Sequence, residues 1–169
     1  IVLMSVPQVV GQSPDEEPVT PENAHRLTPV RLMGFGAVYG MKWSPDGTLL
    51  AITSRAGVHL IPFEENNLNR LAAQLLDHNL VSVRDAAFSP DGTQLATAVS
   101  DGTVRLWDIA QYPAMPLGTL GGHSQLIYQV AFSPDGRWIA TADADVVRLW
   151  NASTYELSLS LPGHSTVAF

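Results

Sequence analysis

Three of the five histidines and three serine–aspartate pairs are the residues of this sequence that could do chemistry. His78, His123 and His164 could form a metal site or supply a general base if the fold brought them together. They are separated by 45 and 41 residues, close to the spacing of other phrases that recur along the chain. Equivalent positions of successive repeats lie in different structural units. We therefore predict separate structural histidines and no metal site.

The serine–aspartate pairs belong to three copies of the phrase Ser-Pro-Asp-Gly, which begin at Ser44, Ser89 and Ser133. A serine nucleophile needs a base within hydrogen-bond reach and an oxyanion site, and the sequence contains no Gly-x-Ser-x-Gly elbow. Proline fixes an early turn dihedral, and Asp-Gly supplies a side-chain acceptor and a positive φ. The phrases therefore predict tight turns.

Asp143 and Asp145 could contact a cation, but two carboxylates lack the other oxygen ligands of a calcium loop. We therefore read this stretch as a solvated turn. Together with the two preceding interpretations, this predicts that the chain is not an enzyme and that it holds no cofactor and no metal ion.

The composition fits one ordered, soluble domain. Of the 169 residues, 46% are hydrophobic and 15% are charged, which gives enough apolar material for a core. The formal net charge of −7 opposes binding to phosphate backbones, so no nucleic-acid partner is expected. The absence of cysteine excludes disulfides and thiolate chemistry. No apolar run approaches the roughly 18 to 20 residues that cross a bilayer, so the chain is not expected to be membrane-embedded.

The elements that must position these residues follow from the repeat period. The Ser-Pro-Asp-Gly phrases lie 45 and 44 residues apart, which matches the roughly 40 to 45 residues of a four-stranded propeller blade. An aromatic residue precedes each phrase and an apolar run follows it, which predicts a β-hairpin. A third strand is predicted at 58–62, 104–108 and 147–151, and a fourth at 69–76, 115–120 and 155–161. Each repeat is therefore predicted to be one blade.

Three phrases, taken in order, resemble the WD-repeat family: Asp-Gly-Thr-Val-Arg-Leu-Trp-Asp at 101–108, Gly-Gly-His-Ser at 121–124, and Val-Ala-Phe-Ser-Pro-Asp-Gly at 130–136. The resemblance implies an all-β WD-repeat β-propeller at residues 25–169, with about three four-stranded blades. The implied units are a latch strand at 26–33, blades at about 34–77, 78–121 and 122–162, and the start of a further blade at 163–169.

A closed ring needs about four to eight blades, so the ring is predicted to be incomplete. Uncovered apolar blade faces drive association. We therefore expect either a fragment of a longer reading frame or, alternatively, self-association through the uncovered faces.

In WD repeats, a histidine, a Ser or Thr, an Asp and a third-strand Trp typically form a buried hydrogen-bond network. The resemblance implies such a network in the second repeat, where each member can satisfy another. Its predicted members are His78, Thr97, Asp101 and Trp107.

The other two repeats depart from this pattern. The third supplies His123, Thr141 and Trp150, but its turn is one residue shorter, so neither Asp143 nor Asp145 falls at the expected distance from the Trp. The first repeat has Phe35 near the histidine position and Ile61-Pro62 near the Trp-Asp position. We therefore expect the first blade to be held by apolar packing alone.

The N-terminus predicts export. Residues 1–10 are almost wholly apolar and precede an acidic, proline-rich stretch, so residues 1–24 are interpreted as a signal-peptide remnant and linker. The stretch 20–27, which leads into Gly34-Phe-Gly, resembles the start of exported bacterial members of the family. An extracytoplasmic or secreted bacterial protein is expected, with a cytoplasmic location as the alternative.

The resemblance implies a rigid scaffold that binds a protein or peptide partner and rarely performs chemistry itself. Tyr39, Arg84 and Tyr128 each lie four residues before the first-strand aromatic, where the inner strand begins near the channel. Tyr and Arg are favoured interface anchors, so these are the candidate partner-binding residues, and ordinary strand-start residues are the alternative. The second functional hypothesis is a sensor or regulatory part of a larger enzyme whose catalytic domain lies outside this chain.

Overall fold

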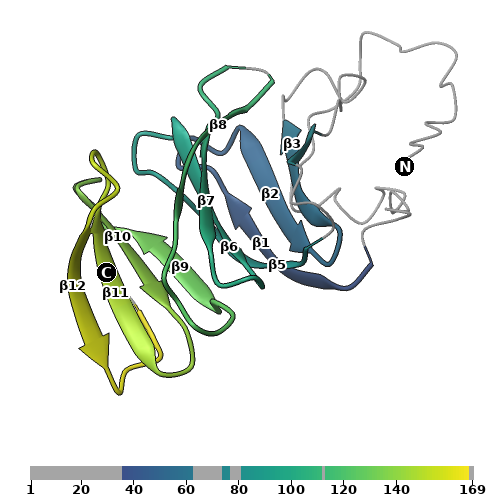
Figure 1. Cartoon of the computed structure of the whole chain (residues 1–169). Helices are drawn as coiled ribbons and strands as arrows, with labels where there is room; N and C mark the ends of the chain where they lie inside the picture. Colours follow the sequence, from purple (N-terminus) through teal and green to yellow (C-terminus); the bar gives the residue numbers. More distant parts are fainter. Residues whose placement is uncertain (1–35, 63–73, 77–80, 112, 168–169) are drawn as a thin grey trace, which may run out of the picture.

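The computed structural model describes residues 36–62, 74–76, 81–111 and 113–167. Every regular element in these ranges is a β-strand, and the strands form three antiparallel four-stranded sheets (Figure 1). The strands of each sheet follow one another in chain order from one edge to the other. The predicted all-β fold of four-stranded blades is therefore confirmed.

Each sheet corresponds to one sequence repeat. The first blade contains β1 (Val38–Trp43), β2 (Leu49–Ser54), β3 (Gly57–Pro62) and β4 (Gln74–Leu76). The second contains β5 (Val83–Phe88), β6 (Gln94–Val99), β7 (Val104–Asp108) and β8 (Met115–Leu120). The third contains β9 (Gln129–Phe132), β10 (Trp138–Ala142), β11 (Val146–Asn151) and β12 (Leu157–Pro162).

The Ser-Pro-Asp-Gly phrases form the turns between the first two strands of each blade. In the third blade, the Ser133 hydroxyl group donates to Asp135 Oδ1 at 2.6 Å and accepts from the Trp138 N–H at 3.0 Å. Gly136 has a φ of 71°, a conformation that favours glycine. The serine and aspartate are therefore occupied in closing a turn.

The blades stack side by side through their apolar faces. Strands β1, β5 and β9 contact one another in turn, so they form the inner edge of an arc (Figure 1). One apolar cluster fills the first interface and includes Ala51, Val58, Leu76, Val83, Ala86 and Leu95. A second cluster fills the next interface and includes Leu106, Leu120, Ile127, Ile139 and Trp150. Burial of each valine, leucine or isoleucine side chain in these clusters contributes about 1.5–3 kcal/mol.

The ring is open, and the exposed fractions of two equivalent leucines show what an uncovered blade face changes. Leu120 pairs with Val104 in the second blade, and Leu161 pairs with Val147 at the same register position of the third. Leu120 is 1% exposed because the third blade covers it, whereas Leu161 is 40% exposed. Leu157 and Leu159 of the same strand are exposed as well. The third blade therefore has an uncovered apolar face.

Some expectations lie outside the described residues. These are the signal-peptide remnant and linker at 1–24, the latch strand at 26–33, His78 and Phe35. The fourth strands are described, and they start at Gln74, Met115 and Leu157.

Leu120 and Leu161 offer a matched test of blade stacking. Leu120→Ala should lower the free energy of unfolding by about 2–5 kcal/mol, because it opens a cavity between two blades. Leu161→Ala, at the equivalent but open position, should cost less than about 1 kcal/mol. Urea unfolding followed by circular dichroism measures both values, and equal losses would contradict the stacked arrangement.

Candidate functional site

A buried polar chain joins the strands of the third blade. Trp150 Nε1 donates to Thr141 Oγ1 at 2.9 Å, and this hydroxyl lies 2.7 Å from His123 Nε2. His123 Nδ1 lies 2.7 Å from Asp143 Oδ2. The backbone N–H groups of Asp145 and Val146 donate to the other oxygen of Asp143, each at 2.8 Å. The chain therefore runs from the indole to a carboxylate held by its own turn.

The protonation states follow from burial and from these bonds. Burial lowers the pKa of His123 by more than its hydrogen bond to Asp143 raises it. Burial alone would raise the pKa of Asp143, but the bonds from His123 and from two backbone N–H groups together lower it. A neutral imidazole then donates from Nδ1 to an ionised carboxylate and accepts at Nε2 from the Thr141 hydroxyl. Each donor in the chain thus has an acceptor, which identifies a structural network.

The third repeat forms its network although neither aspartate lies at the expected distance from the Trp, and Asp143 supplies the carboxylate. Asp143 does so because it directly precedes the turn, where its N–H bonds the Val146 carbonyl group at 3.1 Å. The distance along the chain from the Trp did not predict this contact, because the shorter turn places the carboxylate directly after the end of β10. Side chains alternate between the two faces of a strand, so the position of Asp143, two residues beyond Thr141, puts both on the same face.

The second blade contains part of the predicted network. Trp107 Nε1 donates to Thr97 Oγ1 at 3.1 Å, and Thr97 Oγ1 donates to the Arg105 carbonyl group at 3.1 Å. His78 lies outside the described residues.

The assignment of Asp101 to this network is wrong. Its exposed carboxylate accepts from the N–H and the hydroxyl of Thr103 and lies 3.5 Å from Arg105 Nη2. An aspartate that can bond the backbone two residues on is satisfied within its own turn. Asp101 therefore caps the turn rather than joining the buried chain.

In the first blade, apolar residues replace the hydrogen-bonded pair. Ile61 occupies the register position of Trp107 and Trp150, and Ile52 occupies that of Thr97 and Thr141. Both isoleucines are buried. His59 is also buried in this blade, and burial is the main reason why its pKa is lowered to about 4. Sequence reasoning missed His59 because it follows no repeat position that carries histidine.

Two of the candidate partner-binding residues form a pair across the first interface. The register of β1 with β2 shifts between Val38 and Gly40, and that of β5 with β6 shifts between Val83 and Asp85. Tyr39 and Arg84 are therefore inserted residues of β-bulges, which re-aim a side chain. Arg84 Cζ lies 4.4 Å from the centroid of the Tyr39 ring, a cation–π contact.

Tyr128 occupies the corresponding place in the third blade. It directly precedes β9, and its N–H donates to the Ala142 carbonyl group at 2.9 Å. Tyr39 and Tyr128 are 38% and 49% exposed. The second and third blades are joined nearby, because the Val130 N–H donates to Asp85 Oδ2 at 3.1 Å. We call Tyr39, Arg84 and Tyr128 the strand-start surface.

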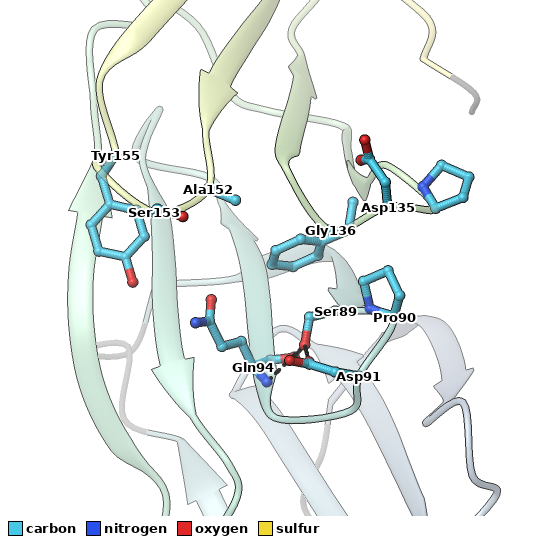
Figure 2. Close-up of a pocket in the computed structure, with 11 residues that line it drawn as sticks. Ser89, Pro90, Asp91, Gln94, Asp135, Gly136, Ala152, Ser153 and Tyr155 are labelled. Atoms are coloured by element: carbon cyan, nitrogen blue, oxygen red, sulfur yellow. Dashed lines mark hydrogen bonds between the residues drawn. The ribbon is translucent and has the colours of Figure 1, made fainter.

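A cavity of about 500 Å³ lies at the opposite end of the inner strands, between the second and third blades (Figure 2). Sequence reasoning did not predict it. The second blade contributes one of its turns and the start of β6, and the third blade contributes two of its turns. The lining residues are Ser89, Pro90, Asp91, Gln94, Phe132, Pro134, Asp135, Gly136, Ala152, Ser153 and Tyr155.

Within the described ranges, no cluster of three or more His, Asp or Glu side chains could hold a metal ion. No helix in that part of the chain is long and apolar enough to cross a membrane.

Comparison with known proteins agrees with this geometry. Residues 70–108 and 114–151 match the family described as "WD domain, G-beta repeat". The chain is similar to a chain of the structure titled "Crystal Structure of Mitotic Checkpoint Complex", with a TM-score of 0.64 and 22% sequence identity. The fold is an open β-propeller, and two of its stretches match WD-repeat units.

The extent of these matches limits what they show. The structural alignment covers 75% of this propeller chain and 37% of the other chain, and at that identity it shows the fold alone. No curated protein matches the sequence. Because 1016 solved chains match in structure, the propeller fold by itself does not select a partner.

Thr141→Val tests the buried polar chain. It keeps the side-chain shape but leaves Trp150 Nε1 and His123 Nε2 without their shared partner, so the free energy of unfolding should fall by about 1–3 kcal/mol. Thr119→Val on the exposed face of β8 is the matched control and should change it by less than about 0.5 kcal/mol. Urea denaturation gives both values, and a neutral effect at Thr141 would refute the network's contribution.

His59 should make stability depend on pH. The folded-state pKa of about 4 lies below the ordinary value of 6.5, so the unfolded chain binds the proton more readily. Stability should therefore fall as the pH decreases from 6.5 toward 4. His59→Gln removes this group, so the variant should lose less stability than the wild type between pH 7.5 and 5 in urea titrations. Parallel profiles for the two proteins would contradict a buried neutral imidazole.

Proposed function

We propose that the chain is the non-catalytic, partner-binding part of a WD-repeat scaffold, and that a protein or peptide contacts the strand-start surface. The observation that carries the proposal is the Tyr39–Arg84 pair, which two bulges place side by side on neighbouring blades. Propeller blades hold such residues on a rigid sheet, so little order has to be gained on binding.

The chemistry of the surface supports this proposal. Tyrosine and arginine dominate binding energies at interfaces because they combine large apolar area with polar groups. The Arg84 guanidinium group lies over the Tyr39 ring. A partner that supplies a carboxylate or carbonyl oxygen would satisfy this group. The similar structure is itself that of a protein complex, as its title states.

Two further expectations remain predictions. Export from a bacterial cell rests on residues 1–27, which lie outside the described residues. Self-association rests on the exposed leucines of β12. The scaffold proposal requires neither of them.

Peptide selection tests the proposed surface. Peptides enriched from a phage-displayed random library on the immobilised chain are synthesised, and their Kd values are measured by isothermal titration calorimetry. Tyr39→Ala, Arg84→Ala and Tyr128→Ala should each weaken binding by about tenfold or more, as interface anchors do. Met115→Ser, an exposed apolar position on the outer strand β8, is the control and should leave Kd unchanged.

The proposal fails in either of two cases. One is that no selected peptide binds in the titration. The other is that selected peptides bind all three variants as tightly as the wild type.

A further inference from the structure

The cavity between the second and third blades is a departure from the repeat, because the interface between the first and second blades is packed at the equivalent place. Leu49 and Gln94 are equivalent, since the N–H of each donates to the turn serine five residues before it. Ile109 and Ala152 are also equivalent, since each follows the third-strand Trp by two residues and donates to the carbonyl group at the same turn position.

These two exchanges open the cavity. At the first interface, Ile109 is buried in the apolar cluster and Leu49 packs against that cluster. At the second interface, Gln94 and Ala152 stand in their places and both line the cavity. Replacing isoleucine with alanine removes three carbon atoms, and glutamine adds a polar amide. The repeat has therefore exchanged apolar filling for a polar-lined space.

Two carboxylates of the lining can accept further hydrogen bonds. Asp91 and Asp135 use Oδ1 for the bonds that close their turns, and Oδ2 of each accepts no hydrogen bond from a described residue. The hydrogen bonds from Ser89 and Ser133, followed by those from the turn N–H groups, lower the pKa of these two carboxyls. Both are therefore ionised at neutral pH. Arg137, two residues beyond Asp135, has a favourable charge interaction with that carboxylate, and no such interaction with an arginine of the described residues acts on Asp91.

The remaining walls are apolar or aromatic. The Tyr155 ring is held against the second blade, because a Cβ added at Gly118 would lie 3.2 Å from Tyr155 Cδ2. Phe132 adds a second ring, and Pro90 and Pro134 add apolar surface. Figure 2 shows the two turns facing each other with the Tyr155 ring across from them. The Gln94 amide and the Tyr155 hydroxyl make no hydrogen bond within the described residues, so both can bind a ligand.

We propose that this cavity binds an arginine side chain of a partner peptide. A guanidinium group offers five donors in one plane, which suits carboxylate and amide acceptors, and its flat face stacks on aromatic rings. The aliphatic stem suits the proline walls. The size lies within the range of small-ligand sites. The formal net charge of −7 attracts cations to the propeller. This site goes beyond the strand-start surface and lies at the other end of the inner strands.

The test titrates the ¹⁵N-labelled chain with the blocked tripeptide acetyl-Ala-Arg-Ala-amide and follows backbone amide shifts by NMR. Saturable shifts are expected at Gln94, Gly136 and Ser153. The same peptide with citrulline has nearly the same shape but no charge, and it should bind on the order of tenfold more weakly. A lysine peptide should also bind more weakly, because a point charge cannot bridge several acceptors in one plane.

Two variants locate the binding. Ala152→Ile restores the residue type found at the equivalent position of the second blade, so it should fill the cavity, keep the fold and weaken binding by about tenfold. Asp135→Asn should weaken binding by about the same factor, because it removes a charge from the lining. Asp46→Asn is the matched control, since Asp46 closes the same turn in the first blade and does not line the cavity. It should bind the tripeptide like the wild type.

Each alternative result overturns the proposal. Equal binding of the citrulline peptide would show that charge is not recognised, and equal binding of the lysine peptide would remove the arginine assignment. Unchanged binding to a folded Ala152→Ile variant would place the peptide elsewhere. Tyr39→Ala should leave tripeptide binding intact, so failure at the cavity and failure at the strand-start surface are separable.

Discussion

Each four-stranded sheet of this chain has two apolar faces, and only a neighbouring sheet can cover them. A sheet alone would leave side chains such as Leu120 in water, and the next blade reduces the exposure of that leucine to 1%. The same constraint explains the placement of the turns. In each Ser-Pro-Asp-Gly turn the aspartate bonds within its own turn, so the turn closes without a hydrogen bond from the neighbouring blade. Packing between blades and turn closure within them are therefore independent, which lets one sequence phrase recur at every blade.

The polar networks inside the blades differ from one blade to the next. The third blade has the full chain from Trp150 to Asp143, whereas the first replaces the Trp–Thr pair with two isoleucines. Both arrangements satisfy the rule that a buried polar group needs a partner, either by supplying every partner or by removing the polar groups. The hydrogen-bonded Trp–Thr pair and the pair of isoleucines are thus two ways to fill the same buried positions of a blade. This explains why the network stabilises a blade without being required for the blade to form.

The repeat period, the turn residues and the strand alternation made the blades predictable from the sequence, because all three are local properties. The network was only partly predictable. His123, Thr141 and Trp150 lie at the positions that the repeat predicts. Asp143 joins the network because its turn is shorter. Asp101 lies outside the network because its carboxylate bonds within its own turn. The cavity was not predictable from motifs. Its signal is a comparison of equivalent positions, Gln94 with Leu49 and Ala152 with Ile109, and only the structure shows that these positions meet at the interfaces between blades.

The exchange at the second interface has an energetic consequence. A cavity between blades lowers stability, since the side chains around it lose contacts that the first interface keeps. Blade stacking alone does not explain this loss of stability, because an isoleucine at position 152 would fill the space as Ile109 does at the first interface. Sites that bind ligands commonly sacrifice stability in this way, and the lining here also has two charges and a fixed aromatic ring. The departure from the repeat, rather than the repeat itself, is therefore the feature that supports the proposed arginine site.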